Sequence, residues 1–68
     1  MMKFYIVKVN TDLAIARGWK RSDPALTKVL ELAKLFRYKQ GAEKFIRNNQ
    51  PRLRRWQIVP VFVTVTEV

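Results

Sequence analysis

The C-terminal stretch Trp56–Val68 constrains the fold more than any other part of the chain, because it is the one long run with strand composition. It is rich in Val, Ile, Phe and Thr, which suit a pleated, half-buried surface. It contains no basic residue, whereas Arg52, Arg54 and Arg55 just before it form the densest positive charge in the chain. The stretch therefore predicts the strand on which a sheet is built, with the arginines at the edge of a working surface.

The apolar face of this stretch changes sides near Pro60. Trp56 and Ile58 are apolar at even positions before it, whereas Val61 and Val63 are apolar at odd positions after it. A proline in a strand belongs at an edge or a bulge, and one extra residue at a bulge reverses the facing. The pattern therefore predicts a bulge or kink at Pro60.

The same stretch is long for so short a chain. Fully extended at roughly 3.3 Å per residue it would span about 40 Å, more than a domain of this size is wide. Its end is therefore expected to pack beyond the core, for instance on a second copy, which predicts a homo-oligomer formed through the C-terminal strand.

The N-terminal segment reads as a second source of strand. Phe4–Val9 is apolar on both faces, which favours a central place in a sheet. Asn10-Thr11-Asp12 is a turn signal, because Asn and Asp bond their own backbone. Leu13–Arg17 is then either a second strand or a short helix, and its shortness between two turn signals favours a hairpin.

The middle of the chain carries helix signals. Asp23 followed by Pro24 is typical of a helix start, and apolar residues then recur at helical spacing, which predicts a helix from Pro24 to between Ala33 and Lys39. A glycine inside a helix costs roughly 1 kcal/mol relative to alanine, so Gly41 predicts a break. A short second helix over Ala42–Asn48 follows.

These elements predict a single small α+β domain over residues 1–68. The order strand, strand, helix, helix, strand gives a three-stranded, largely antiparallel sheet with the helices on one face. With neither Cys nor His among 68 residues, neither a disulfide nor a zinc site is expected. The scattered carboxylates and the lack of a Gly-rich phosphate loop predict no enzyme and no cofactor.

Charge is the remaining functional signal. Fourteen Lys and Arg against five Asp and Glu give a net charge of +9, which indicates a polyanionic or acidic partner. Between Lys34 and Arg55 the only acid is Glu43. Basic residues with aromatics among them suit phosphates plus base stacking. The candidate binding residues are Arg37, Lys39, Lys44, Arg47, Arg52, Arg54 and Arg55, with Trp19 as a stacking residue or, more in keeping with a small domain, a core residue.

Four stretches, Tyr5–Lys8, Leu32–Lys39, Gly41–Ile46 and Trp56–Val61, resemble small uncharacterised α+β proteins encoded by bacteriophages. The resemblance implies an accessory phage protein, a class that often binds and redirects a host enzyme. It also implies that Leu35–Arg37 is extended rather than helical. The Arg-rich segment and the Val/Thr tail depart from the pattern, so no functional residue carries over.

Two functions follow as predictions. The first is a non-catalytic module that binds DNA or RNA through the basic residues. The second is a phage-encoded modulator that uses the same residues against an acidic host protein, such as a polymerase or nuclease. The absence of a signal-peptide pattern and of any long apolar run predicts a cytoplasmic protein that does not act at a membrane.

Overall fold

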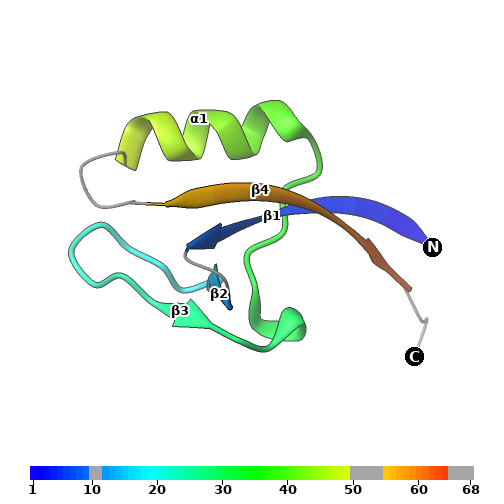
Figure 1. The fold of residues 1–68 in the computed structure, drawn as a ribbon, viewed down its shortest axis with the longest axis horizontal. Helices are drawn as coiled ribbons and strands as arrows, with labels where there is room; N and C mark the ends of the chain where they lie inside the picture. The colour runs from blue at the N-terminus through cyan, green and yellow to red at the C-terminus, as the bar shows by residue number, and fades with distance from the viewer. Residues whose placement is uncertain (10–11, 50–54, 65–68) are drawn as a thin grey trace.

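The computed structural model describes residues 1–9, 12–49 and 55–64. Its elements follow one another along the chain from blue to red in Figure 1. They are β1 (Met2–Val9), β2 (Leu13–Ile15), β3 (Leu26–Thr27), the 3-10 turn η1 (Leu30–Leu32), α1 (Lys39–Asn49) and β4 (Trp56–Val63). The α+β class is as predicted, but the sheet has four strands and the described residues form one α-helix rather than two.

The sheet has the order β3-β2-β1-β4 and all its pairings are antiparallel. β1 lies in the middle, as its two apolar faces predict, and pairs with β4 over its full length from Met2↔Val63 to Val9↔Trp56. The hairpin interpretation of Leu13–Arg17 is confirmed, because β2 pairs with the end of β1. The predicted turn at Asn10-Thr11 falls largely outside the described residues.

The predicted helix from Pro24 is wrong. Asp23 does not cap a helix; its N–H donates to the Lys20 carbonyl and its carbonyl accepts from the Lys20 N–H, which closes a tight turn. Leu26–Thr27 then pairs with β2, and the Thr27 hydroxyl accepts a bond from the Val29 N–H. Such local side-chain bonds compete with helix formation, and here the sheet offers backbone partners as well.

The segment after η1 explains why this part of the chain is extended. β2 is short and pairs with β1 only at Lys8 and Val9. The residues of β1 before Lys8 therefore need backbone hydrogen-bond partners from another segment on that side. Phe36 supplies them, since it exchanges two 2.8 Å backbone bonds with Tyr5, and Lys34 donates to the Ile15 carbonyl. Leu35–Arg37 is therefore not helical, as the resemblance implied, and tertiary pairing has overridden the helical spacing.

The helix α1 begins at Lys39, so the predicted break at Gly41 is wrong. Gly41 lies in the first turn, where its N–H bonds to the Tyr38 carbonyl at 3.1 Å. The rest of the helix matches the expected Ala42–Asn48 segment to within a residue.

The predicted bulge at Pro60 is also wrong, because the register from Val63 to Trp56 is unbroken. The apolar pattern changes sides for a different reason: both faces of β4 are packed. Ile58 contacts the cluster beneath α1, whereas Val59 and Val61 contact a second cluster on the other side. The end of the tail, residues 65–68, lies outside the described residues.

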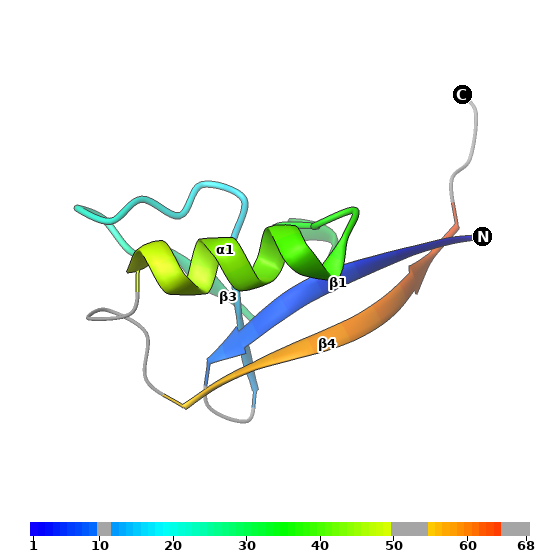
Figure 2. The same ribbon diagram turned by 90° about the horizontal axis from the view of Figure 1, so that it is seen from above.

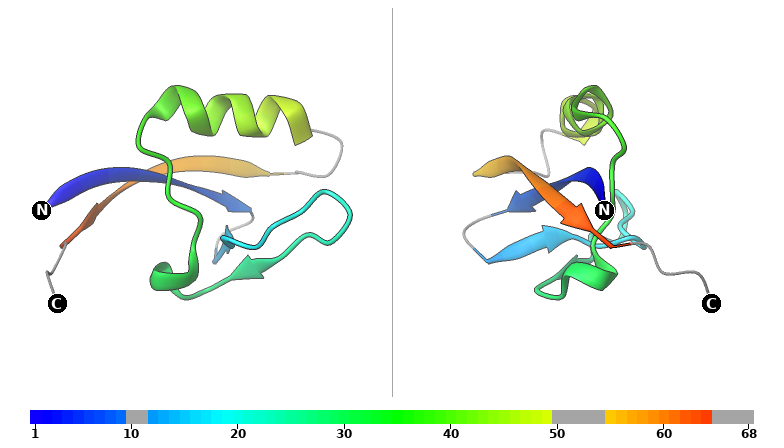
Figure 3. Two further views of the ribbon diagram at one scale, coloured as in Figure 1. Left: turned by 180° about the vertical axis from the view of Figure 1, so that it is seen from behind. Right: turned by 90° about the vertical axis from the view of Figure 1, so that its right-hand side faces the viewer.

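Two apolar clusters lie on the two faces of this sheet. The face covered by α1, here called the helix face, holds Val7, Ile15, Trp19, Ala42 and Ile46. The opposite face, here called the open face, holds the smaller cluster Ile6, Ala14 and Ala33. Figures 1 and 3 show α1 on one side of β1 and β4, with β2, β3 and η1 on the other.

Candidate nucleic-acid interface

The solvent side of α1 presents two of the predicted binding residues. Ala42, Ile46 and Asn49 are buried against the sheet. Lys44 and Arg47 are exposed and lie three residues apart, so they point to the same side, away from the core. The amphipathic pattern that buries one stripe of this helix therefore also fixes the direction of its two cations.

Aromatic packing holds α1 in place. Phe45 meets Trp19 edge-on with ring centroids 5.0 Å apart, and Phe36 at 5.4 Å. The Lys34 ammonium lies over the rings of Phe45 and Phe36, at 5.6 and 5.8 Å from their centroids. At the end of the helix the Asn49 side-chain amide donates a 2.8 Å bond to the Phe45 carbonyl. The two exposed cations thus stand on a firmly packed support.

The beginning of β4 adds a third cation and an aromatic ring. Arg55 is exposed and has a φ of 54°, in the left-handed region that a non-glycine residue adopts only where the structure requires it. Trp56 follows and is 43% exposed, although it pairs with Val9 in the sheet. Figures 1 and 2 show the C-terminal end of α1 and the start of β4 at the same end of the molecule.

Three of the other predicted residues, Lys39, Arg37 and Trp19, lie elsewhere in the structure. Lys39 begins α1, about 12 Å along the helix axis from Arg47 at 1.5 Å per residue. Arg37 lies on the open face, where its guanidinium is 5.7 Å from the centroid of the Phe4 ring. Trp19 is only 9% exposed and belongs to the core, as its size favoured. Arg52 and Arg54 lie outside the described residues.

We call the exposed residues Lys44, Arg47 and Arg55, on α1 and just before β4, the basic end, together with Trp56. Trp56 was not among the predicted binding residues. Its position at the first residue of an edge strand leaves it half-exposed. The sequence signal for Trp56 as a binding residue was its place directly after the arginine run.

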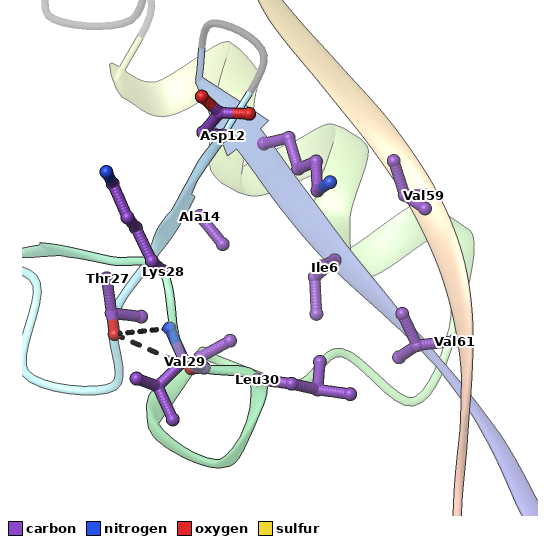
Figure 4. Close-up of a pocket in the computed structure, with 11 residues that line it drawn as sticks. Ile6, Asp12, Ala14, Thr27, Lys28, Val29, Leu30, Val59 and Val61 are labelled. Atoms are coloured by element: carbon purple, nitrogen blue, oxygen red, sulfur yellow. Dashed lines mark hydrogen bonds between the residues drawn. The ribbon is translucent and has the colours of Figure 1, made fainter.

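Sequence reasoning missed the open face. There the sheet curls so that β3 and the residues after it face β4 across a hollow of about 260 Å³ (Figure 4). Its floor consists of small and branched side chains, including Ala14, Ala33 and Val59. The hollow depends on β3, which the helix prediction did not contain, so no signal in the sequence indicated it.

Neither a metal-binding cluster nor a membrane-spanning helix occurs among the described residues. No group of three or more His, Cys, Asp or Glu residues that could hold a metal ion occurs in residues 1–9, 12–49 and 55–64. Within the same ranges, no helix is long and apolar enough to cross a membrane.

Comparison of the chain with protein-family models, with curated proteins and with solved structures gave no match. The resemblance to bacteriophage-encoded proteins therefore stays a prediction.

Proposed function

We propose that the protein is a non-catalytic module that contacts nucleic acid through its basic end. The observation that carries the proposal is that Lys44 and Arg47 are exposed on α1 and that Arg55 and Trp56 are exposed at the start of β4, which lies at the same end of the molecule as the end of α1 (Figures 1 and 2), in a chain of net charge +9. Because α1 is already packed on the core, phosphate binding to Lys44 and Arg47 does not have to order their backbone. Each phosphate contact also releases condensed counterions. The basic end therefore supplies affinity that does not depend on sequence.

Trp56 bears on the kind of nucleic acid. An exposed indole stacks on an unpaired base, a contact worth about 1–3 kcal/mol per base, whereas bases inside a duplex are already stacked. A ring next to Arg55 combines this stacking with a phosphate contact. The arrangement favours single-stranded DNA or RNA, or the loops of structured RNA, over uninterrupted duplex.

An acidic protein surface is the second candidate for the same residues. Tryptophan and arginine are the residue types that most often dominate protein–protein binding energy, and here they are adjacent. This candidate corresponds to the phage-encoded modulator of a host enzyme. It differs from the first in its test, because generic DNA and RNA would not bind.

The test is a titration of labelled single- and double-stranded DNA and RNA at 50 and 200 mM salt. With about three phosphate contacts to a single strand, the affinity is expected to fall about twentyfold over this fourfold salt range. A combined Lys44→Gln, Arg47→Gln, Arg55→Gln variant should bind weakly and lose most of the salt dependence.

The matched control removes three charges at the other end of the molecule, with Lys3→Gln, Arg37→Gln and Lys39→Gln. This variant has the same net charge as the first and should retain most of the affinity. Equal losses in both variants would mean that binding follows net charge and not the basic end. Failure of the parent protein to bind any of the four nucleic acids at 50 mM salt would reject the proposal in favour of a protein partner.

A further inference from the structure

The open face carries two neighbouring hollows that share one side chain. The first, of about 260 Å³, is the one between β3 and β4. The second, of about 350 Å³, lies between η1 and the end of β4 and is lined by Leu35 and Val63. Leu30 lines both. Figure 4 shows Leu30, Val29, Ile6 and Val61 around the first hollow. The two hollows are therefore neighbours on either side of Leu30, and most of their lining side chains are apolar.

This surface is apolar, and residues 1–9, 12–49 and 55–64 leave it uncovered. Val29 is 47% exposed and Leu30 is 44% exposed, while the small cluster beneath them is closed only by half-buried valines and Leu35. Branched and aliphatic side chains gathered around a hollow, rather than scattered singly, mark interaction surfaces in small soluble proteins. Nucleic acid offers few apolar groups to such a surface, so its occupant is of another class.

The charges at the margin of the hollows indicate what kind of occupant fits. Lys8 and Lys28 line the first hollow and Arg17 lines the second, against Asp12 and Glu31. The Arg17 guanidinium is already bonded to the backbone carbonyl of Glu31, not to its carboxylate. Arg37 adds a further cation beside Phe4 on the same face. The margin is thus net positive.

The net charge also separates a foreign partner from a second copy. Two chains of +9 repel one another, and the margins of two open faces would bring like charges together. An acidic partner is attracted instead of repelled, because the protein as a whole is positive and the margin of the hollows offers cations. Charge therefore selects an acidic occupant, and the hollows select one with apolar side chains.

We propose that the open face binds an acidic, amphipathic polypeptide segment, whose apolar side chains enter the two hollows on either side of Leu30. Lys8 and Lys28 face its carboxylates at the first hollow. A peptide laid into a groove by its apolar face is a common mode of recognition. This site lies on the opposite side of the sheet from α1, so it does not depend on the basic end and both surfaces can be occupied together.

The probe is a fluorescent peptide that carries leucines at helical spacing i, i+3, i+4 and i+7, with glutamates at the remaining positions. Two control peptides have the same length: one replaces every glutamate with lysine, and one keeps the composition but scrambles the order. Binding is measured by fluorescence anisotropy on the full chain at 50 mM salt. Saturable binding of the first peptide alone is expected. No binding of it, or equal binding of the lysine peptide, would overturn the proposal.

Leu30 and Leu32 provide a matched pair of variants for locating the site. Both are exposed leucines of η1, at 44% and 56%, but only Leu30 lines the hollows. Leu30→Glu should weaken peptide binding about tenfold or more, as expected for a central interface residue. Leu32→Glu makes the same charge change and should leave the affinity within about twofold. Equal effects of the two variants would reject the location.

A second pair tests the charged margin. Lys8→Gln with Lys28→Gln should lower the affinity about threefold at 50 mM salt and reduce its salt dependence, whereas Lys3→Gln with Lys39→Gln should not. Competition with single-stranded DNA separates the two surfaces, because DNA bound at the basic end should leave the peptide bound. Displacement of the peptide by DNA, or dimerisation of the free protein that Leu30→Glu abolishes, would assign the open face to another occupant and overturn the proposal.

Discussion

The two faces of the sheet share the same strands but carry different kinds of side chain. The helix face is filled by large rings, with Trp19, Phe36 and Phe45 packed edge-on or tilted against one another beneath α1. The open face is floored by Ala14 and Ala33 and closed only in part by half-buried valines. Small domains bury only part of the surface that their unfolded chains expose, and among the described residues the open face is the less covered of the two. The contrast indicates that one face stabilises the fold and leaves the other available for binding.

The largest expected effect is at the centre of the helix face. Trp19→Ala removes the ring that meets Phe45 at 5.0 Å and should lower the free energy of unfolding by about 3–5 kcal/mol. This is enough to unfold much of so small a domain. Urea denaturation followed by circular dichroism measures it. A loss below about 1 kcal/mol would show that the helix face is not the main source of stability.

A smaller effect is expected for Val61→Ala, a smaller truncation on the open face. Val61→Ala removes two methylene equivalents, each worth about 0.8 kcal/mol when fully buried, from a half-buried site beside a hollow. The free energy of unfolding should fall by about 1 kcal/mol in the same denaturation assay. A loss comparable to that of Trp19→Ala would erase the distinction between the two faces.

A gain is expected where α1 begins. A methyl group added at Gly41 would lie 3.6 Å from the Phe36 ring, an ordinary contact distance, and the backbone there is not left-handed. Gly41→Ala should therefore raise the free energy of unfolding by about 0.5–1 kcal/mol, because the unfolded chain loses freedom while the helix keeps its geometry. Thermal denaturation against the parent protein checks this. A decrease would place strain at the helix start.

The smallest expected change in stability concerns the outer edge of β4. Tyr5 directs its backbone N–H and carbonyl toward Phe36, so in its pairing with Pro60 neither residue bonds the other, and Pro60 faces the free edge. The missing N–H there interrupts the row of donors that another strand would use. Pro60→Thr restores the donor and should change the free energy of unfolding by less than about 0.5 kcal/mol while increasing self-association.

Sedimentation velocity at several protein concentrations measures that association. If the sedimentation coefficient of Pro60→Thr rises with concentration, and that of Leu30→Glu equals that of the parent protein, then association uses the β4 edge and the open face stays free. If Pro60→Thr leaves the sedimentation coefficient unchanged at every concentration, the proline does not protect the edge.

The sequence by itself determined the elements whose signals are local. Alternation and β-branched composition identified β1 and β4, and helical spacing identified most of α1. It also showed a stretch from Lys34 to Arg55 in which Glu43 is the only acid, with Lys44 and Arg47 on the side of the helix away from its apolar stripe. These features depend on residues close together in the chain, so they can be recognised without knowing the fold.

Tertiary structure alone decided that residues 24–37 are not α-helical, that the sheet has an open face and that Arg37 lies apart from the basic end. Residues 24–37 have helical spacing, but Tyr5 and Ile15 offer backbone groups that need partners, and pairing with Phe36 and Lys34 satisfies them. Long-range pairing also created the open face, kept the β1–β4 register unbroken through Pro60 and placed Arg37 beside Phe4, away from the basic end. Hydrogen-bond demand between distant segments leaves no periodic trace in a sequence, and for that reason the helix prediction failed while the two long strands were recognised.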